Sequence, residues 1–258
     1  MGLFDKIFEK KICDICGGEI GLLGNRKLED GNCCKTCAGK LSPFFSDRRS
    51  STVEEIKQQL AYREANKAEV AKFNVTCTIG GDYTKLLLDE DNRKFMVTGA
   101  RNLEDANPDV LDYSMVTGCT LDIDEHREEQ KRKDAEGNMV SYMPPRYSYS
   151  YDFNVIIRVS HKYFDQITLR LNSSDVETTP EGGVPSNRPH NPRLDVNYRE
   201  YEKMGNDIIS LLTDVRQQVR DEIAAAAAPK TAATCPYCGA TTIPDANGCC
   251  EFCGGAMG

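Results

Sequence analysis

Apolar and polar positions alternate with a period of two through much of residues 74–172, which is the pattern of β-strands with one buried face. Leu86–Leu88 and Phe95–Val97 flank the polar turn Asp89–Asn92, so these residues predict a hairpin. The same alternation extends over three further segments, Val75–Ile79, Met115–Ile123 and Tyr147–Leu171. The region is therefore predicted to form a central antiparallel β barrel or sheet.

Helical spacing replaces this alternation on both sides. Residues 51–73 are predicted to form a long helix that starts at a capping box within Ser51–Glu55. The apolar side of this helix is interrupted by Arg63 and Lys67. Residues 196–223 return to the helical period and lead into a linker of small residues before the last segment of the chain.

Three segments stand apart from these elements. Glu125–Met143 is strongly polar and predicts an exposed loop or hairpin tip. Residues 172–195 are rich in proline and glycine, which predicts a mobile loop. Residues 1–11 place Leu3 and Ile7 on one face of a helix that either folds back on the body or contacts a membrane surface or a partner.

The 258 residues carry a formal net charge of −8, of which residues 73–195 contribute −7. This acidic balance argues against a nucleic-acid binder, because phosphate contacts need a basic face. No apolar stretch approaches the ~20 residues of a membrane-spanning helix. Charged residues from Asp5 onwards interrupt the apolar run that a secretory signal would need. We therefore expect a cytoplasmic protein.

Ten of the 12 cysteines lie in two clusters, each with two Cys-x-x-Cys pairs. Two thiolates three positions apart can hold one tetrahedral Zn²⁺ at ~2.3 Å from each sulfur. A glycine after the pair lets the backbone turn tightly beneath the metal. The sequence therefore predicts two structural zinc sites, each with four thiolates and no open position for water. The expected ligands are Cys13, Cys16, Cys34 and Cys37 in the first site and Cys235, Cys238, Cys250 and Cys253 in the second.

Other uses of these cysteines fit the pattern less well. Disulfides need an oxidising compartment, and a redox Cys-x-x-Cys occurs as one pair beside a βαβ pattern. An iron–sulfur cluster also uses four thiolates, but the glycines after the pairs favour zinc. Cys33 and Cys249 each adjoin an expected ligand and could replace it. Together with Cys77 and Cys119 they are interpreted as small core residues or spare thiols.

The sequence contains no recognisable catalytic constellation. Its histidines, His126, His161 and His190, occur in three different contexts, and His-Glu-x-x-His, Gly-x-Ser-x-Gly and P-loop patterns are missing. Asp122 and Asp124 share one face of a strand and could bind a divalent cation, but a strand end in solvent explains them as well. We therefore expect a protein that is not an enzyme.

The likeness of residues 10–70 to a known family rests on Cys13-Asp-Ile-Cys-Gly17, Ile20-Gly-Leu-Leu-Gly24, Leu41-Ser-Pro-Phe-Phe45 and the helix start at Ser51. These residues resemble the bacterial domain-of-unknown-function family 4428, whose name implies no activity. A knuckle, a hairpin around Gly24–Asn25 and two ligands at a helix start resemble a treble-clef zinc finger.

Two further resemblances concern the rest of the chain. The strands and the following helix resemble a pleckstrin-homology or GRAM-like domain, and the end of the chain is similar to short zinc ribbons of bacterial proteins. Pleckstrin-homology domains that hold phosphoinositides use basic residues in the first hairpin loop. The acidic turn Asp89–Asn92 would instead repel a phosphate, which favours a protein partner over a lipid.

These patterns predict an α+β multidomain chain. Its expected parts are a zinc-finger domain over 1–50, a connecting helix over 51–73, a β-rich pleckstrin-homology-like domain over 74–228, and a linker with a zinc ribbon over 229–258. The expected function is that of a non-enzymatic zinc-binding adaptor whose β domain binds a protein. Membrane-surface binding through the β domain or residues 1–11 is one alternative, and nucleic-acid or ribosome binding through the zinc fingers is another.

Overall fold

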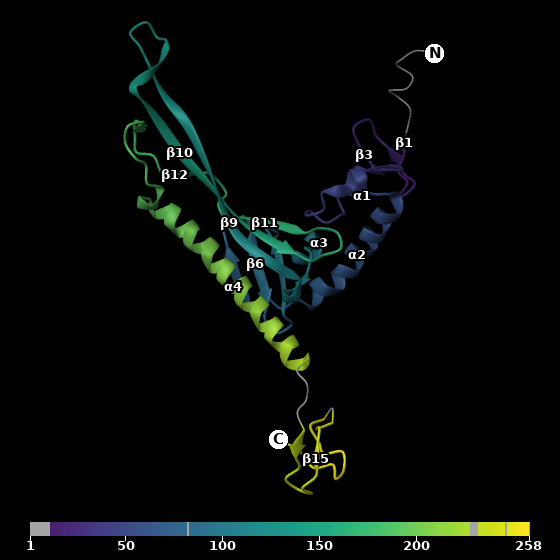
Figure 1. The fold of residues 1–258 in the computed structure, drawn as a ribbon. Helices are drawn as coiled ribbons and strands as arrows, with labels where there is room; N and C mark the ends of the chain where they lie inside the picture. Colours follow the sequence, from purple (N-terminus) through teal and green to yellow (C-terminus); the bar gives the residue numbers. More distant parts are fainter. Residues whose placement is uncertain (1–10, 82, 228–231, 246, 258) are drawn as a thin grey trace. The chain divides into compact units, whose positions relative to one another are not determined.

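The structure is a computed structural model that describes residues 11–81, 83–227, 232–245 and 247–257 (Figure 1). The chain divides into two compact units, Met1–Arg216 and Gln217–Gly258. The helix expected over residues 1–11 falls outside the described residues except at Lys11, which belongs to the strand β1. Within the described ranges, no helix is both long and apolar enough to cross a membrane.

The first unit begins with two small hairpins and a long helix. β1 pairs with β2, and β3 pairs with β4, so the strands expected to pair around Gly24–Asn25 take different partners. The helix α2 begins at Thr52, whose Oγ1 accepts from the Glu55 N–H at 3.3 Å, and this bond belongs to the predicted capping box. The elements are β1 (Lys11–Ile12), β2 (Glu19–Ile20), β3 (Asn25–Lys27), β4 (Asn32–Cys34), α1 (Lys35–Ala38), the 3-10 helix η1 (Asp47–Ser50) and α2 (Val53–Lys72).

A four-stranded antiparallel sheet follows, in the order β5-β6-β7-β8. Asp89 is in register with Lys94, which confirms the hairpin predicted around Asp89–Asn92. The apolar residues at the centre of this hairpin, including Leu88 and Phe95, are fully buried. The elements are β5 (Cys77–Gly80), β6 (Lys85–Asp89), β7 (Lys94–Thr98), α3 (Leu103–Ala106) and β8 (Leu111–Asp112).

A second antiparallel sheet is built around β10. β9 pairs with one edge of β10 over almost its whole length, and the short strands β11, β12 and β13 share the other edge. Figure 1 shows the β9–β10 hairpin as a long two-stranded ribbon. The elements are η2 (Tyr113–Met115), β9 (Val116–Lys133), β10 (Met139–Val159), β11 (Gln166–Arg170), β12 (Val176–Glu177), β13 (Val184–Pro185) and η3 (Pro192–Leu194).

Two polar segments differ from their predictions. Most of Glu125–Met143 is strand rather than loop, because its backbone groups pair between β9 and β10 although neither face is buried. The turn itself is short, and the Asp134 N–H donates to the Asn138 carbonyl at 2.9 Å. The expected loop over residues 172–195 contributes β12, β13 and η3.

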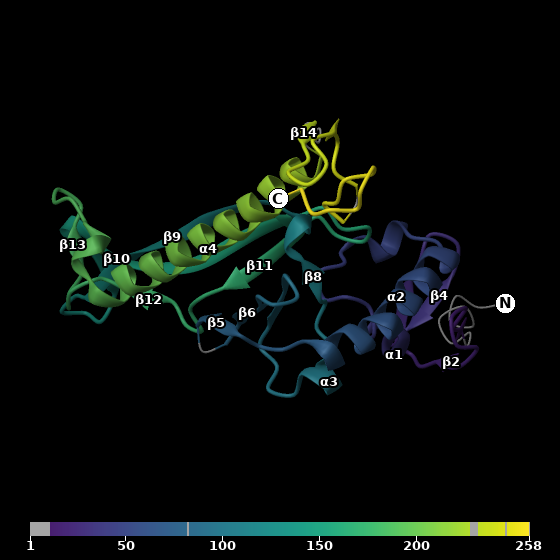
Figure 2. The ribbon, with the colours of Figure 1, turned by 90° about the horizontal axis from the view of Figure 1, so that it is seen from below.

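The helix α4 (Val196–Ala227) lies along the second sheet over its first part (Figure 2). The ring of Tyr198 meets those of Tyr151 and Phe153 edge-on, with centroids 5.0 Å apart in both cases. Gly205 allows close packing, because a Cβ there would lie 2.5 Å from Cδ1 of Leu121. The core of the second sheet is therefore closed by the N-terminal half of α4.

In the second unit, β14 (Ala233–Thr234) pairs with β15 (Thr241–Thr242) to form a small hairpin. An isolated antiparallel bridge joins Cys249 to Ala256. The predicted α+β class, with antiparallel sheet in the middle of the chain and a cysteine-rich segment towards each end, is confirmed.

Candidate metal centres

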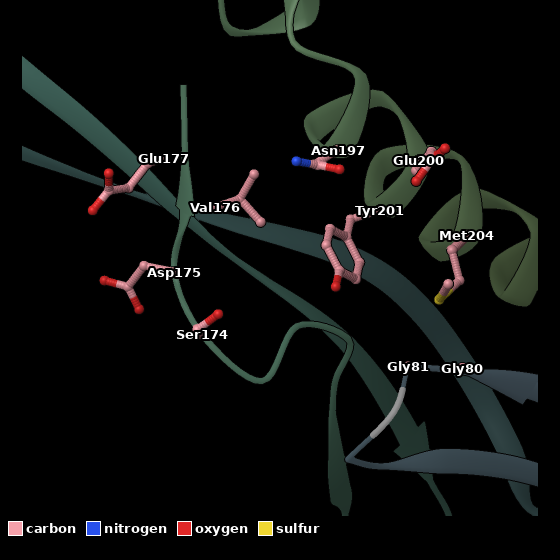
Figure 3. A pocket seen from close by; sticks show the side chains of 10 residues that line it. All are labelled: Gly80, Gly81, Ser174, Asp175, Val176, Glu177, Asn197, Glu200, Tyr201 and Met204. Atoms are coloured by element: carbon pink, nitrogen blue, oxygen red, sulfur yellow. The ribbon is translucent and has the colours of Figure 1, made fainter. Parts of the chain in front are cut away.

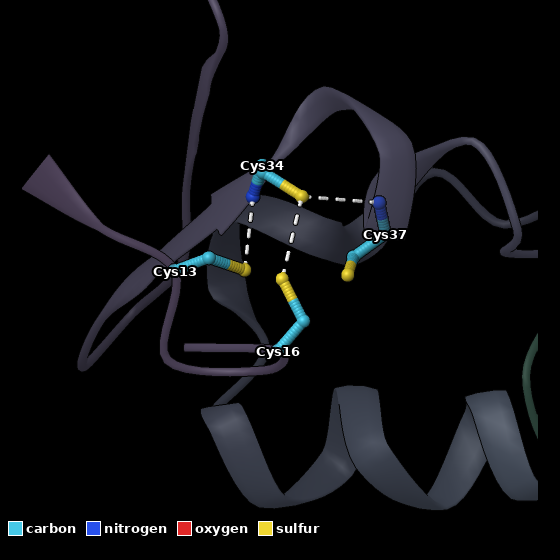
Figure 4. A group of neighbouring side chains, drawn as sticks. All are labelled: Cys13, Cys16, Cys34 and Cys37. Carbon is cyan, nitrogen blue, oxygen red and sulfur yellow. Dashed lines mark hydrogen bonds between the residues drawn. The ribbon is translucent and has the colours of Figure 1, made fainter. Parts of the chain in front are cut away.

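The first four-cysteine group forms where two turns of the N-terminal part meet. Cys13 and Cys16 come from the turn between β1 and β2, Cys34 caps the N-terminus of α1, and Cys37 lies within α1. Their four Sγ atoms lie within 4.8 Å of one another, with 3.9 Å between those of Cys16 and Cys34. Figure 4 shows the four side chains pointing toward a common centre.

Backbone N–H groups also point at these sulfur atoms. The Cys34 N–H donates to Sγ of Cys13 at 3.2 Å, and the Cys37 N–H donates to Sγ of Cys34 at 3.3 Å (Figure 4). Such bonds favour the thiolate form, because the N–H dipole stabilises negative charge on sulfur. The backbone is thus arranged for thiolates at this site.

The second four-cysteine group lies in the second unit and repeats this arrangement. Its four Sγ atoms also lie within 4.8 Å of one another. Sγ of Cys235 is 3.6 Å from that of Cys253, and Sγ of Cys238 is 3.7 Å from that of Cys250. Cys235 and Cys250 are buried while Cys238 and Cys253 are exposed, so each pair contributes one inner and one outer sulfur.

Three of the four Cys-x-x-Cys pairs share one backbone turn. In each, the glycine after the pair donates its N–H to the carbonyl of the first cysteine at 2.8 or 2.9 Å. Gly17, Gly239 and Gly254 have φ angles of 71°, 73° and 70°, in the left-handed region where glycine has no Cβ to clash. The fourth pair, Cys34 and Cys37, is set by the first turn of α1 instead.

The sulfur spacing fits a tetrahedral metal site. Four thiolates at ~2.3 Å from a central Zn²⁺ lie ~3.8 Å from one another, and the measured separations are 3.6, 3.7 and 3.9 Å. A disulfide would bring two sulfurs to ~2.05 Å, and all 12 cysteines are free. The structure therefore supports two closed thiolate cages of the predicted composition, while the identity of the metal stays a prediction.

The surroundings of the first group act in opposite directions on the acidity of two of its thiols. Burial alone would raise the pKa of Cys13, but the N–H groups of Cys16, Cys34 and Ile15 lower it to about 6. Burial and the neighbouring sulfurs raise the pKa of Cys37 far above its usual range. Four thiolates this close repel one another, and a divalent metal at the centre would offset that repulsion.

The cysteines next to the expected ligands stay outside both groups. Cys33 is fully buried and its Sγ donates to the Cys34 carbonyl at 3.4 Å. Burial and the charges of Cys13 and Cys34 raise the pKa of Cys33 to about 11. Sγ of Cys249 donates to the Asn247 carbonyl at 3.8 Å. The geometry thus places Cys34 rather than Cys33 in the first four-cysteine group. In the same way it places Cys250 rather than Cys249 in the second.

No other trio of His, Cys, Asp or Glu side chains in the described ranges is close enough to share a metal ion. Asp122 and Asp124, considered above for a divalent cation, belong to neither group. His190 stacks on Tyr149 with ring centroids 4.3 Å apart, and its Nε2 is 2.8 Å from Oγ1 of Thr178. The rings of His161 and Phe164 pack with their centroids 4.1 Å apart, and burial lowers the pKa of His161.

Sequence reasoning missed a buried polar network on α2. Arg63, which interrupts the apolar side of this helix, is buried and donates from Nη1 to Oδ1 of Asp109 at 2.7 Å. Asn66 donates from Nδ2 to Oδ1 of Asn107 at 2.7 Å and accepts from the Val110 N–H at 3.0 Å. These bonds fasten α2 to the loop before β8, and no signal in the sequence pairs residues so far apart.

A cavity of about 590 Å³ lies between β12, the start of α4 and Gly80–Gly81. Figure 3 shows Tyr201 of α4 projecting toward the segment that carries Asp175 and Glu177. A second cavity of about 550 Å³ shares these two carboxylates and adds Glu125 and Glu128. The sequence predicted an acidic β domain, and the structure gathers several of its carboxylates at two adjoining cavities.

Comparisons with known proteins gave a match for the N-terminal part of the chain only. Neither the search of curated proteins nor the search of solved structures gave a match. The resemblance expected for residues 10–70 is confirmed over residues 11–59 by a family match that contains the first four-cysteine group. Residues 11–59 match the family described as Domain of unknown function (DUF4428).

Proposed function

We propose that the chain binds two structural Zn²⁺ ions, one in each four-cysteine group. The observation that carries this proposal is the sulfur spacing of 3.6 to 3.9 Å, which suits a tetrahedral zinc–thiolate site. Four protein ligands leave no open position for water, so each metal stabilises the fold rather than activating a nucleophile. Such sites need reduced thiols, which supports a reducing compartment such as the cytoplasm.

The finer fold assignments belong to the same proposal. The knuckle between β1 and β2, the β3–β4 hairpin and the ligands at α1 follow the order of a treble clef. The two facing knuckles at Cys235 and Cys250 follow that of a zinc ribbon. A four-stranded sheet, a second sheet built on the long β9–β10 hairpin and a closing helix support the pleckstrin-homology-like assignment of the middle part.

We further propose that this protein is not an enzyme but an adaptor that binds a basic segment of a partner protein. The support is the pair of adjoining cavities that share Asp175 and Glu177. Glu200 lines one cavity and Glu128 the other, so a lysine or arginine side chain would meet several carboxylates. Arg127 also lines the second cavity, but its guanidinium lies 4.6 Å over the Tyr147 ring.

The metal proposal is tested by counting zinc per chain with elemental mass spectrometry. The intact protein should hold two, and Cys16→Ser and Cys238→Ser should each hold one. Cys77→Ser and Cys119→Ser are matched controls outside the groups and should keep two. Fewer than two zinc ions in the intact protein, or iron in their place, would overturn the assignment.

The adaptor proposal is tested by cross-linking affinity purification from the native host. The double variant Asp175→Asn/Glu177→Gln should lose the proteins that the wild type enriches. Glu104→Gln/Asp105→Asn removes two exposed carboxylates of α3 and should keep them. Loss from both double variants, or enrichment of nothing by the wild type, would contradict the acidic surface as the docking site.

A second candidate function is contact with an anionic membrane surface. Met143 is 96% exposed and Met139 is 59% exposed near the tip of the β9–β10 hairpin. Lys131, Arg132 and Lys133 stand on the facing strand, so the tip combines apolar and basic side chains. Vesicles containing phosphatidylserine should then sediment the wild type but not Met139→Ser/Met143→Ser. Equal sedimentation of both proteins would remove the tip from consideration.

A further inference from the structure

β9 is a long strand with one partner. All of its pairing in the structure is with β10, and no other strand of the described ranges pairs with it. β10, by contrast, is paired on both edges along much of its length. From Glu125 to Lys133 the side chains of β9 are mostly exposed. The free edge of β9 therefore offers backbone N–H and C=O groups to an incoming strand.

From Glu125 to Lys133, no charged residue of β9 directly faces an opposite charge on β10. Across the hairpin, Glu129 faces Tyr147, Glu128 faces Ser148, and Arg127 faces Tyr149. Acidic side chains dominate the middle of β9, while its last three residues are Lys131, Arg132 and Lys133. A strand that runs antiparallel to β9 with the same sequence would bring the basic end of one copy beside the acidic middle of the other.

Backbone geometry restricts the registers in which two copies of β9 can pair. Along a strand, alternate residues direct their N–H and C=O groups to the same edge. Two residues that face each other in an antiparallel pair must direct their backbone groups in the same way, either both toward the partner strand or both away from it. When the two strands are copies of each other, the two residue numbers are therefore both odd or both even, and their sum is even. The twofold axis then passes through one residue, which faces its own copy.

The charge pattern favours one of these registers. With the axis at Glu128, Arg127 faces Glu129, Glu125 faces Lys131, and Asp124 faces Arg132. Symmetry repeats each pair, which gives six opposite-charge pairs against one contact between the two Glu128 side chains.

Neighbouring registers are poorer. With the axis at Arg127, Glu125 would face Glu129, and with the axis at Glu129, Arg127 would face Lys131. Both registers place like charges directly opposite each other, which is destabilising in a sheet.

We propose that two copies of the chain associate through their β9 edges, antiparallel, with the twofold axis at Glu128. The paired segment runs from Ile123 to Lys133, about 36 Å of strand at ~3.3 Å per residue. The two hairpins then form one continuous sheet. This proposal is independent of the metal sites, but Glu125 and Glu128 of the paired segment also line the second acidic cavity.

Zero-length carbodiimide cross-linking of the wild-type protein tests the register. Glu125 and Lys131 lie six positions apart on one strand, about 20 Å at ~3.3 Å per residue, so they cannot be joined within one copy. A Glu125–Lys131 cross-link in the dimer band, identified by mass spectrometry, is the expected result. Its absence from the dimer band, or the lack of such a band, would overturn the register.

Charge exchange tests the same interface by light scattering after gel filtration. The variant Arg127→Glu/Lys131→Glu makes the segment acidic, and Glu125→Lys/Glu129→Lys makes it basic. Each should be monomeric alone at concentrations where the wild type is dimeric. An equimolar mixture should restore a dimer, because all six charged pairs that flank Glu128 then join opposite charges.

Circular dichroism and metal content serve as the folding check for both variants. Arg158→Glu alters an exposed side chain of β10 outside the paired segment and should stay dimeric. A monomeric wild type, or a mixture of the two variants that stays monomeric, would overturn the proposal.

Discussion

Arg63 of α2 and Asp109 of the loop before β8 form a buried ion pair, with 2.7 Å between Nη1 and Oδ1. Their side chains are 8% and 0% exposed, so both charges have left water. The second carboxylate oxygen accepts from Oγ of Ser42 at 2.8 Å, and the guanidinium also donates to the Asn107 carbonyl. The pair is fully hydrogen-bonded and joins the helix after the first metal site to the first sheet.

Replacing Arg63 by methionine should therefore destabilise the protein strongly. The variant leaves the Asp109 carboxylate buried with only Ser42 as a donor, and removal of one member of a buried pair typically costs about 3–5 kcal/mol. Urea denaturation followed by circular dichroism measures the loss. Arg63→Met/Asp109→Leu should recover part of it, because the unpaired charge is then absent.

Lys67→Met is the matched control on the same helix. Lys67 pairs with Glu64 at 2.7 Å, but both side chains are more than half exposed, so the expected change is below about 1 kcal/mol. A similar loss for Arg63→Met and Lys67→Met would contradict a structural role for the buried pair.

The cysteine groups could be predicted from the sequence because each Cys-x-x-Cys pair is defined by residues that are close together in the chain. Cys-x-x-Cys with a following glycine specifies a turn within six residues, and Gly17 and Gly239 adopt that turn. The role of Arg63 could not be predicted, because its partner lies 46 residues away and a charged residue on a helix reads as a solvated position. The same limit applies to Asn66, which is 3% exposed.

Removal of the first metal should loosen the start of α2 as well as the cysteine turns. Cys13, Cys33 and Cys37 share a buried cluster with Ile56 of α2, so the proposed metal and the helix stabilise each other. Cys13→Ser should raise amide hydrogen exchange over residues 11–41 and the first turns of α2, but not in β6 and β7. Unchanged exchange in α2 would show that the helix is held by the Arg63 network alone.

Cys238→Ser provides the matched change in the other group. The second site lies in a separate compact unit, so the increase in exchange should be confined to residues 232–257. The comparison shows whether each metal stabilises its own unit.

Asp89 should make the first sheet sensitive to acid. This carboxylate is fully buried and accepts from the N–H groups of Asn74 at 2.9 Å and Asn92 at 3.1 Å. Burial alone would raise the pKa of Asp89, but these bonds, the Asn92 amide and Lys94 lower it below its ordinary 3.8.

A pKa lowered by folding contributes stability that is present above about pH 4 and is lost as the pH falls through the folded value. Asp89→Asn should thus be less stable than the wild type by about 1–3 kcal/mol at pH 7, with a difference that shrinks below pH 4. Urea denaturation between pH 2 and pH 7 measures it. Glu90→Gln removes a neighbouring exposed charge, and an identical pH profile for the two variants would contradict the effect of burial.

Asp89 also shows why polar turns are hard to interpret from sequence. Asp89–Asn92 was expected to be an exposed acidic tip, yet its first carboxylate is a buried acceptor that closes the turn. The converse holds for Glu125–Met143, where polar residues form strands because the β9–β10 ladder satisfies their backbone without burying either face. Hydropathy patterns indicate which apolar side chains are buried. The buried Asp89 carboxylate and the exposed β9–β10 ladder depend on hydrogen bonds instead, so hydropathy indicates neither of them.

Gly81→Ala should be the most damaging single methyl addition among these predictions. A Cβ at Gly81 would lie 1.7 Å from the carbonyl oxygen of Leu171 and 2.8 Å from its carbonyl carbon, so one backbone would have to move. Leu171 is fully buried where the second sheet meets the turn between β5 and β6, and movement there would open the packing between the sheets. The expected loss is about 3 kcal/mol or more, at the upper end of overpacking effects.

Gly118→Ala is the control, because its nearest neighbour is Cδ of Arg158 at 4.0 Å, and its stability should stay within about 1 kcal/mol of the wild type. Urea denaturation of the two variants in parallel measures the difference. Equal unfolding midpoints would show that the backbone of Leu171 can move at little cost. The contact between the sheets would then not depend on the absence of a side chain at position 81.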